Sequence, residues 1–295
     1  MSIPSSFSQI DTTYIGKFKH EFSVEIYLAK KYTSLRYDGK DITENYLPNT
    51  PINIGIGLSW KGFGLSISHG FNFLRDTKRG KTRALDLQYH YYGRKLVLDF
   101  FGQNYKGLYL ENGNEGKSLE IFPDVQLVQI GVFGQYVFNG NKFSYRAAFD
   151  QSERQLKSAG SLLVGGGVYY NRILINDETD TKRSSYQFGP NVGYAYNQVI
   201  RKDFYVSGSL SFGVNGGVDE NSSKLNYYPN VFGRFSTGYN AESWSVNFSY
   251  VDNRLYIMYI ESDPVSMSTG KFQLIFVKRF DSKSKILKRL SRLTS

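Results

Sequence analysis

Three polar residues, Asp86, Gln88 and His90, recur at two-residue spacing in a stretch whose intervening residues are apolar. Asp99 follows nine residues after His90, on the far side of a predicted turn. A histidine oriented by a carboxylate can act as a general base, and Ser144 could supply its nucleophile. The same residues could instead form hydrogen bonds and ion pairs that brace the fold, because buried charges need partners. We favour the structural interpretation over catalysis.

The spacing of these residues predicts the elements that carry them. In segment 52–60 the even positions are Ile, Ile, Ile, Leu and Trp, whereas the odd positions are Asn, Gly, Gly and Ser. A β-strand directs alternate side chains to opposite faces, so the two sets meet different surroundings. The same alternation continues to residue 105. We therefore predict strands with an apolar outer face and a polar inner face.

Thirteen segments carry this pattern, and most reach the roughly 9 to 11 residues that cross a membrane in a tilted barrel strand. Soluble strands usually stop near 5 or 6 residues. The pattern therefore predicts an all-β fold, a transmembrane antiparallel up-and-down β-barrel. The candidate strands are 22–37, 52–60, 63–73, 83–92, 95–110, 125–138, 142–150, 161–175, 185–200, 204–214, 225–239, 244–256 and 265–280.

The connections between these segments alternate between short turns and long polar loops, as in bacterial barrels. Short turns fall at 61–62, 93–94, 139–141, 201–203 and 240–242. The alternation fails at 161–175, which has a long connection on both sides. We predict twelve strands, with that segment not an ordinary spanning strand; the alternative is fourteen strands, if a turn near 165–167 divides it. The barrel then occupies 20–280, between an N-terminal periplasmic segment or plug at 1–19 and a basic tail at 281–295.

The composition excludes several classes of protein. The chain of 295 residues has no cysteine and only three histidines, so disulfides and multi-histidine metal sites are not expected. We expect no cofactor. The formal net charge is +10, but five of the cations lie in the last 15 residues, and no nucleic-acid motif accompanies them. We expect no nucleic-acid partner.

The inner face of the predicted barrel has one polar wall and one wall of small residues. Small inward residues on other strands leave room for long side chains, water, a ligand or residues 1–19 as a plug. Such a lumen should be narrow. The predicted lumen network consists of Asp86, Gln88, His90, Asp99, Gln103, Arg146 and Asp150.

Aromatic residues lie at the edges of the predicted lipid-facing surface, where rings settle between headgroups and acyl chains. The alternative is a soluble core rich in Tyr and Phe. His69 is in the outward register of its strand, and we interpret it as an interfacial residue. The predicted lipid-interface aromatics are Trp60, Tyr91, Tyr136, Trp244 and Tyr250.

Several longer segments carry a family resemblance over residues 12–212. They are the sequence Pro-Asn-Thr-Pro at 48–51 leading to 61–64, GKTRALDLQYHYYGRK at 80–95, YKG at 105–107 and SYRAAFDQSERQLKSAGS at 144–161. The chain resembles a family of Bacteroidota outer-membrane proteins labelled only as a domain of unknown function. The resemblance implies a barrel exported to the Gram-negative outer membrane, and it implies no activity. The first ten residues do not form a signal peptide, so we interpret the sequence as a mature chain.

The tail after Phe280 places Ile286, Leu287, Leu290 and Leu293 at helical spacing between basic residues. It predicts either an amphipathic helix that lies on a membrane or partner, or a disordered end. The expected function is a narrow pore or a structural subunit of an envelope complex. The alternative is an enzyme that modifies lipid or glycan. Expected partners are outer-membrane lipid and envelope proteins that bind the tail or the loops.

Overall fold

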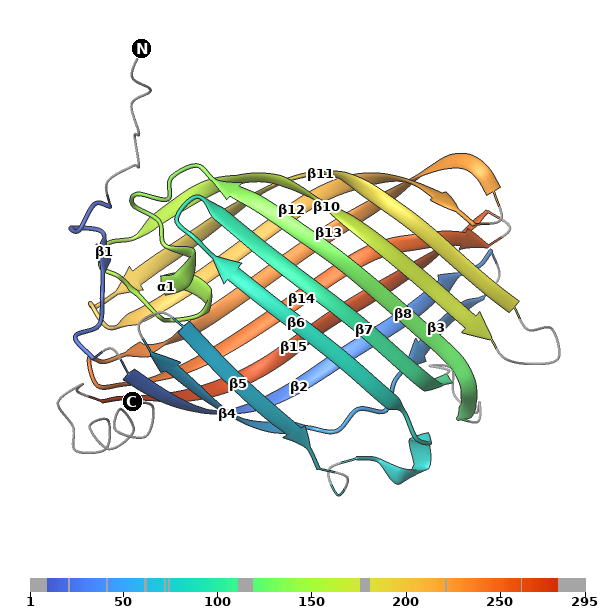
Figure 1. The fold of residues 1–295 in the computed structure, drawn as a ribbon, viewed down its shortest axis with the longest axis horizontal. Helices are drawn as coiled ribbons and strands as arrows, with labels where there is room; N and C mark the ends of the chain where they lie inside the picture. Colours follow the sequence, from blue (N-terminus) through green and yellow to red (C-terminus); the bar gives the residue numbers. More distant parts are fainter. Residues whose placement is uncertain are drawn as a thin grey trace, which may run out of the picture.

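The computed structural model describes residues 10–280 apart from 21, 41, 61–62, 72, 74, 111–118, 176–180, 221 and 261. Long antiparallel strands dominate it (Figure 1). The strands of the main sheet are β2 (Phe22–Asp38), β3 (Thr43–Leu47), β4 (Asn53–Trp60), β5 (Phe63–Gly70), β6 (Arg83–Tyr92), β7 (Leu96–Leu110), β8 (Glu120–Val137), β10 (Ala159–Ile175), β11 (Thr181–Ile200), β12 (Phe204–Asp219), β13 (Ser222–Asn240), β14 (Trp244–Ile260) and β15 (Asp263–Phe280).

Ten of the described strands form a closed ring in the order β2, β3, β7, β8, β10, β11, β12, β13, β14 and β15. The last strand closes on the first, with Phe280 opposite Phe22 and Lys271 opposite Lys31. The short strand β3 closes this ring only near the loop end, where it pairs with 35–38 of β2 and 109–110 of β7. Three strands lie outside the ring and continue the wall toward the turn end: β4 pairs with β2, β5 pairs with β4, and β6 pairs with β7. The prediction of an antiparallel all-β barrel is confirmed, with a strand count that differs from twelve.

The period-two pattern explains the two faces of the wall. Along β12, Tyr205, Ser207, Ser209 and Ser211 are buried inward, whereas Phe204, Val206, Leu210 and Phe212 are exposed on the outer face. Strands β10 and β14 show the same alternation over their turn-end segments, because successive side chains of a strand point to opposite sides. The outer face is therefore an apolar band, as a lipid-facing surface requires.

The prediction of a strand at 142–150 is wrong. This region contains a short helix, α1 (Tyr145–Phe149), within the single connection that joins β8 to β10. Ser144 caps the helix by accepting a hydrogen bond from the backbone N–H of Ala147 at 3.1 Å. The apolar residues mimic strand alternation because barrel wall surrounds the helix, so Tyr145, Ala147 and Ala148 are all buried.

This correction removes the irregularity in the predicted loop pattern. The whole connection 138–158 lies at the end of the barrel that carries the short turns, which we call the turn end, and the opposite end is the loop end. Segment 161–175 is thus an ordinary spanning strand, within β10, with no turn at 165–167. A further strand, β3, lies in a region predicted as loop and pairs with both β2 and β7.

Connection 138–158 fills the turn end and is called the plug below. Its short strand β9 (Arg154–Gln155) pairs with β1 (Ile15–Gly16) near the N-terminus (Figure 1). Residues 1–9 of the predicted N-terminal plug and the tail 281–295 lie outside the described residues. Among the residues described, no helix has both the length and the apolar character needed to cross a membrane.

Two large clusters of buried apolar side chains occupy the lumen, and a smaller one of Tyr105, Leu108 and Val125 lies near the loop end. The large cluster nearer the loop end includes Phe133, Tyr169 and Phe232, and the rings of Phe133 and Phe232 are 4.3 Å apart between centroids. The second packs Tyr145 and Ala148 of the plug against wall residues. Polar and charged side chains lie between the two clusters.

Candidate functional site

A buried ion pair crosses the middle of the lumen. Asp99 on β7 binds the guanidinium of Arg234 on β13, and both side chains are about a tenth exposed or less. Four strands separate β7 from β13 in either direction around the ring, so the pair joins opposite walls. The Nη1 atom of Arg234 also donates a hydrogen bond of 2.6 Å to the Tyr92 hydroxyl.

The second carboxylate oxygen of Asp99 binds His90 on the neighbouring strand β6. The Nδ1 atom of His90 lies 2.5 Å from Oδ1 of Asp99. An ionised carboxylate can only accept, so Nδ1 carries the proton and Nε2 is the free acceptor of the neutral ring. The His90 side chain is about one third exposed. It is therefore an oriented histidine that water can reach.

Asp86 forms a second centre beside the first. Lys31 on β2 lies 2.9 Å from its carboxylate, and Tyr105 donates to the same oxygen at 3.3 Å. Gln88 donates to the other oxygen at 3.0 Å. The Asp86 carboxylate thus links β6 to β2 through Lys31. This link passes the loop-end side of β4 and β5.

Lys271 on β15 points into the lumen, opposite Lys31 in the strand register. Its electrostatic neighbours include the cations Lys31 and Arg234, the acids Asp86, Asp99 and Glu25, and His90. Asp86 and Asp99 already have a cationic partner. In the described part of the chain, the Lys271 ammonium forms no ion pair or hydrogen bond. The lumen thus contains one ammonium group without a counter-ion.

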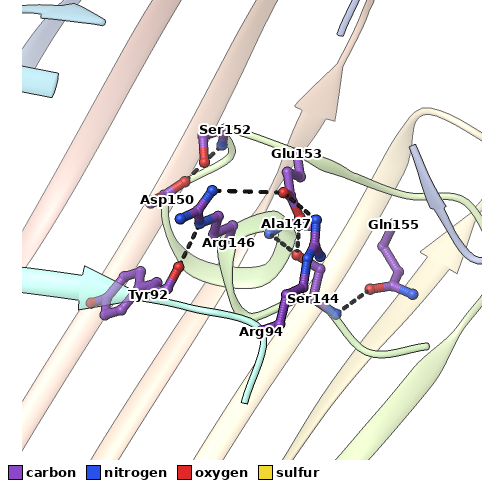
Figure 2. A network of polar contacts seen from close by, with 9 residues as sticks. All are labelled: Tyr92, Arg94, Ser144, Arg146, Ala147, Asp150, Ser152, Glu153 and Gln155. Atoms are coloured by element: carbon purple, nitrogen blue, oxygen red, sulfur yellow. Dashed lines mark hydrogen bonds and ion pairs between the residues drawn. The ribbon is translucent and has the colours of Figure 1, made fainter. Parts of the chain in front are cut away.

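The plug carries a separate polar network at the turn end (Figure 2). Glu153 accepts from Arg94 at 2.5 Å and from the Ser144 hydroxyl at 2.7 Å. Arg146 lies 3.8 Å from the same carboxylate and donates to the backbone carbonyl of Tyr92 at 2.5 Å. This network fixes α1 to the turn between β6 and β7.

Asp150 ends α1 and faces the lumen from the plug. It accepts a hydrogen bond of 2.7 Å from the backbone N–H of Ser152. Enclosure by the surrounding wall raises the pKa of the Asp150 carboxyl, and the hydrogen bonds from Ser152 oppose this shift.

The structure divides the predicted polar network between these centres. Asp86, Gln88, His90 and Asp99 belong to the centre of the lumen, whereas Arg146 and Asp150 belong to the plug. Gln103 is buried on the inner face of β7, and its Oε1 has no hydrogen-bond partner among the described residues. Ser144 binds Glu153 and not His90, so it does not form the nucleophile considered for that histidine.

Sequence reasoning missed Lys31, Arg234 and Lys271. Each of the three is at a position whose side chain points inward in the alternation of its strand. A long cationic side chain at such an inward position is the sequence signal that could have identified them. Their pairing could not be inferred, because Arg234 lies 135 residues from Asp99 in the chain.

The inner wall differs between its two sides. On β8, β10, β11 and β12 most inward residues are buried, including Gln135, Leu163, Ala195 and Ser207. On β2, β5, β6 and β15 several are half-buried or exposed. These are Lys31, Ser66, Ser68, Gln88, His90, Lys271 and Gln273. We call the water-accessible space that they line the chamber.

The chamber adjoins a break in the wall that we call the seam. Strands β5 and β6 follow each other around the barrel, yet no hydrogen-bonded ladder joins them in the described part of the chain (Figure 1). Each therefore has one unpaired edge. The outer side chains beside the seam are exposed and apolar, namely Ile67, Leu85, Leu87 and Tyr89.

A hydrogen-bonded node braces the wall toward the loop end. The Thr82 hydroxyl accepts from the Asn49 backbone N–H at 2.8 Å and donates to the Gly107 carbonyl at 2.6 Å. The Asn49 side chain donates to the carbonyls of Asp76 and Gly80. Three of the segments that carry the family resemblance meet here, and the fourth, 144–161, contains α1 and much of the plug.

The predicted interface aromatics lie on several strands. Tyr91, Tyr136 and Trp244 are exposed on the outer face. Tyr250 is partly buried, because its ring stacks on Phe272 at 4.6 Å between centroids. Trp60 ends β4.

Solved barrel structures show weak similarity to the chain. The outer membrane protease OmpT from Escherichia coli is 9% identical, with 88% of this chain and 96% of that chain covered and a TM-score of 0.37. The P. putida toluene transporter TodX is 7% identical, with 88% and 90% covered and a TM-score of 0.28. The outer membrane protein OprG from Pseudomonas aeruginosa is 12% identical, with 90% and 98% covered and a TM-score of 0.22.

No curated protein matches the sequence significantly. A family model described as "Domain of unknown function (DUF4421)" matches residues 9–280. The resemblance to a domain of unknown function is thus confirmed, whereas an origin in Bacteroidota stays a prediction. Because the match covers most of its length, the chain belongs to the DUF4421 family.

Proposed function

We propose that the protein is a closed outer-membrane barrel that serves as a structural subunit of an envelope complex. The observation that carries this proposal is the Asp99–Arg234 pair, which joins opposite walls of the lumen. An exposed apolar outer face supports a place in the membrane, since a water-soluble barrel would bury such residues.

A freely open pore fits the lumen less well. The apolar cluster that includes Phe133 and Phe232 extends toward the loop end through Leu127 and Ile257, and the plug fills the turn end. A solute would have to break the central ion pair and pass both apolar clusters. Breaking a buried pair by removing one partner is costly, so this closure is expected to persist at rest.

The plug supports the structural role because it is fixed and not hinged. Arg154 binds Asp203 at 2.6 Å and Glu242 at 3.0 Å, which are in or beside two different turns of the barrel. The Arg279 guanidinium lies 3.5 Å from the ring centroid of Phe18 and donates to the carbonyl of Gln151. The turn end thus presents an ordered surface that a periplasmic partner can bind.

Conductance in planar bilayers tests the proposal. We expect the unmodified protein to be silent across voltages and Arg234→Ala to stay silent as well, because the apolar clusters and the plug still close the lumen of the variant. Lys278→Ala, on the outer face of β15, is the control and should stay silent. Stepwise conductance of the unmodified protein would contradict a closed barrel and favour a narrow pore.

A second candidate function is an enzyme that modifies lipid, and His90 favours it. The ring is oriented by Asp99, its free Nε2 can accept a proton, and it lines the chamber beside the seam. Incubation of the pure protein with phospholipid should then release product in a way that His90→Gln abolishes. Absence of product from the unmodified protein would exclude the enzyme for that substrate.

A further inference from the structure

The seam presents a physical problem if the barrel lies in a membrane. The facing edges of β5 and β6 carry backbone N–H and C=O groups with no strand partner. Hydrocarbon cannot satisfy such groups, so a spanning wall normally closes on itself. Water in the chamber can satisfy them from inside, because Ser66, Ser68, Gln88 and His90 along these edges are exposed.

The two sides of the seam have opposite character. Outside, Ile67 is 78% exposed, Leu87 62% and Tyr89 63%. Inside, the side chains are polar, and Lys271 has no counter-ion among the described residues. A molecule that fits this surface must be apolar outside the wall and anionic within it.

The charges inside the chamber favour an anion at one position. The Lys31 ammonium is paired with Asp86, and the Arg234 guanidinium with Asp99, which leaves Lys271 between two satisfied pairs. Glu25 on β2 is a further inward acid among the described residues, and it interacts with Lys271 without forming an ion pair. Its carboxylate lies against Gly57 in β4, toward the plug and Asp150. An anion is therefore expected at Lys271 and away from Glu25.

We propose that the chamber binds the anionic headgroup of an amphiphile that passes laterally between β5 and β6. The Lys271 ammonium pairs with a phosphate or carboxylate, and the seam residues Ser66, Ser68 and Gln88 hydrogen-bond to the rest of the headgroup. The acyl chains stay outside, against Ile67 and the exposed leucines of β6. This inference does not depend on the structural role proposed above.

A peptide strand is the competing occupant, since two facing edges could pair with an inserted strand. The unpaired ammonium favours the amphiphile, because a strand satisfies backbone groups and leaves Lys271 without a partner. Free phosphate could also reach Lys271 through water. The experiment must separate these occupants.

Native mass spectrometry of the full chain, released from detergent, measures binding of three probes: phosphatidylglycerol, phosphatidylcholine and inorganic phosphate. We expect phosphatidylglycerol to bind at least tenfold more tightly than the other two. Lys271→Gln should remove this preference and Lys271→Arg should retain it. Lys278→Gln, on the outer face of the same strand, should change binding less than twofold and so controls for attraction to the membrane surface.

The route is tested by closing the seam. The chain has no native cysteine, so Ile67→Cys with Leu87→Cys supplies one addressable pair, which a bis-maleimide can join. The joined protein should lose phosphatidylglycerol binding at least tenfold, while the same variant without the linker retains it. Binding that survives the linker would overturn lateral passage. Equal binding of inorganic phosphate, or unchanged binding by Lys271→Gln, would overturn the amphiphile site.

Discussion

The two sides of the barrel have the same alternation of polar and apolar residues, but their inner faces differ in how deeply the side chains are buried. Strands β8, β10 and β11 have 18, 17 and 20 residues and are paired on both edges. Strands β4, β5 and β6 have 8, 8 and 10 residues, and the wall is interrupted between the last two. The long side is lined by buried inward residues, whereas the short side borders a water-accessible chamber.

This difference shows that alternation alone does not fill a lumen. On the long side, inward side chains of distant strands contact each other, as when Gln135 donates to Asn191 and Ser211. On the short side, the inward residues of β5 are small and the wall is interrupted in the described residues. The charged residues beside the resulting space form the ion pairs Lys31–Asp86 and Arg234–Asp99. Closure of the lumen therefore depends on the few residues that join the two sides.

The largest effect is expected for Arg234→Ala, which removes the bridge between the sides. The buried Asp99 would lose its cation, and removing one partner of a buried pair costs about 3 to 5 kcal/mol. Urea unfolding in detergent micelles measures this loss. Lys271→Met is the contrast: its ammonium has no partner, so stability should be unchanged or higher. Equal destabilisation by both changes would contradict the distinction drawn between these cations.

Phe232→Ala, on β13, tests the apolar core that packs against the long side. Phe232 packs on Phe133 and Tyr169, and its truncation should cost about 3 to 5 kcal/mol by leaving a cavity. Ser68→Ala, on the accessible side, should change the unfolding free energy by about 0.5 kcal/mol or less. Similar losses at the two positions would mean that the sides are equally packed.

Two glycines of β7 differ in the space that surrounds their Cα atoms. Gly107 has φ +86°, and a Cβ there would lie 2.4 Å from the Lys81 carbonyl oxygen, so Gly107→Ala should cost about 1 to 3 kcal/mol. A Cβ at Gly102 would meet nothing within 4 Å. Gly102→Ala is therefore the matched control, and a loss there equal to that at Gly107 would rule out the steric explanation.

Ser144→Ala should have the smallest effect, about 1 kcal/mol, because it removes the cap of α1. Hydrogen exchange of the Ala147 amide should become faster, since that N–H donates to the Ser144 hydroxyl. Ser144→Thr keeps the oxygen and should restore slow exchange. An unchanged exchange rate in Ser144→Ala would show that the plug is held by its other contacts alone.

The alternation of polar and apolar residues predicted most strands of the barrel wall and some residues of the candidate site. Asp86, Gln88, His90 and Asp99 lie on two strands joined by a tight turn, so their proximity follows from local pattern. Arg146 and Asp150 are at alternating positions that suggested the inner face of a strand, yet they belong to the plug. Local alternation cannot separate a strand from a short helix that is surrounded on all sides.

The amino-acid pattern is sufficient to predict antiparallel strands with an apolar outer face, because a period of two in polarity has no other regular solution at these lengths. Three features follow only from the three-dimensional arrangement: the contact of Arg234 with Asp99, the entry of the plug into the turn end, and, in the described residues, the lack of a ladder between β5 and β6. These features depend on how a closed ring brings distant residues together, and ring closure depends on all the strands at once.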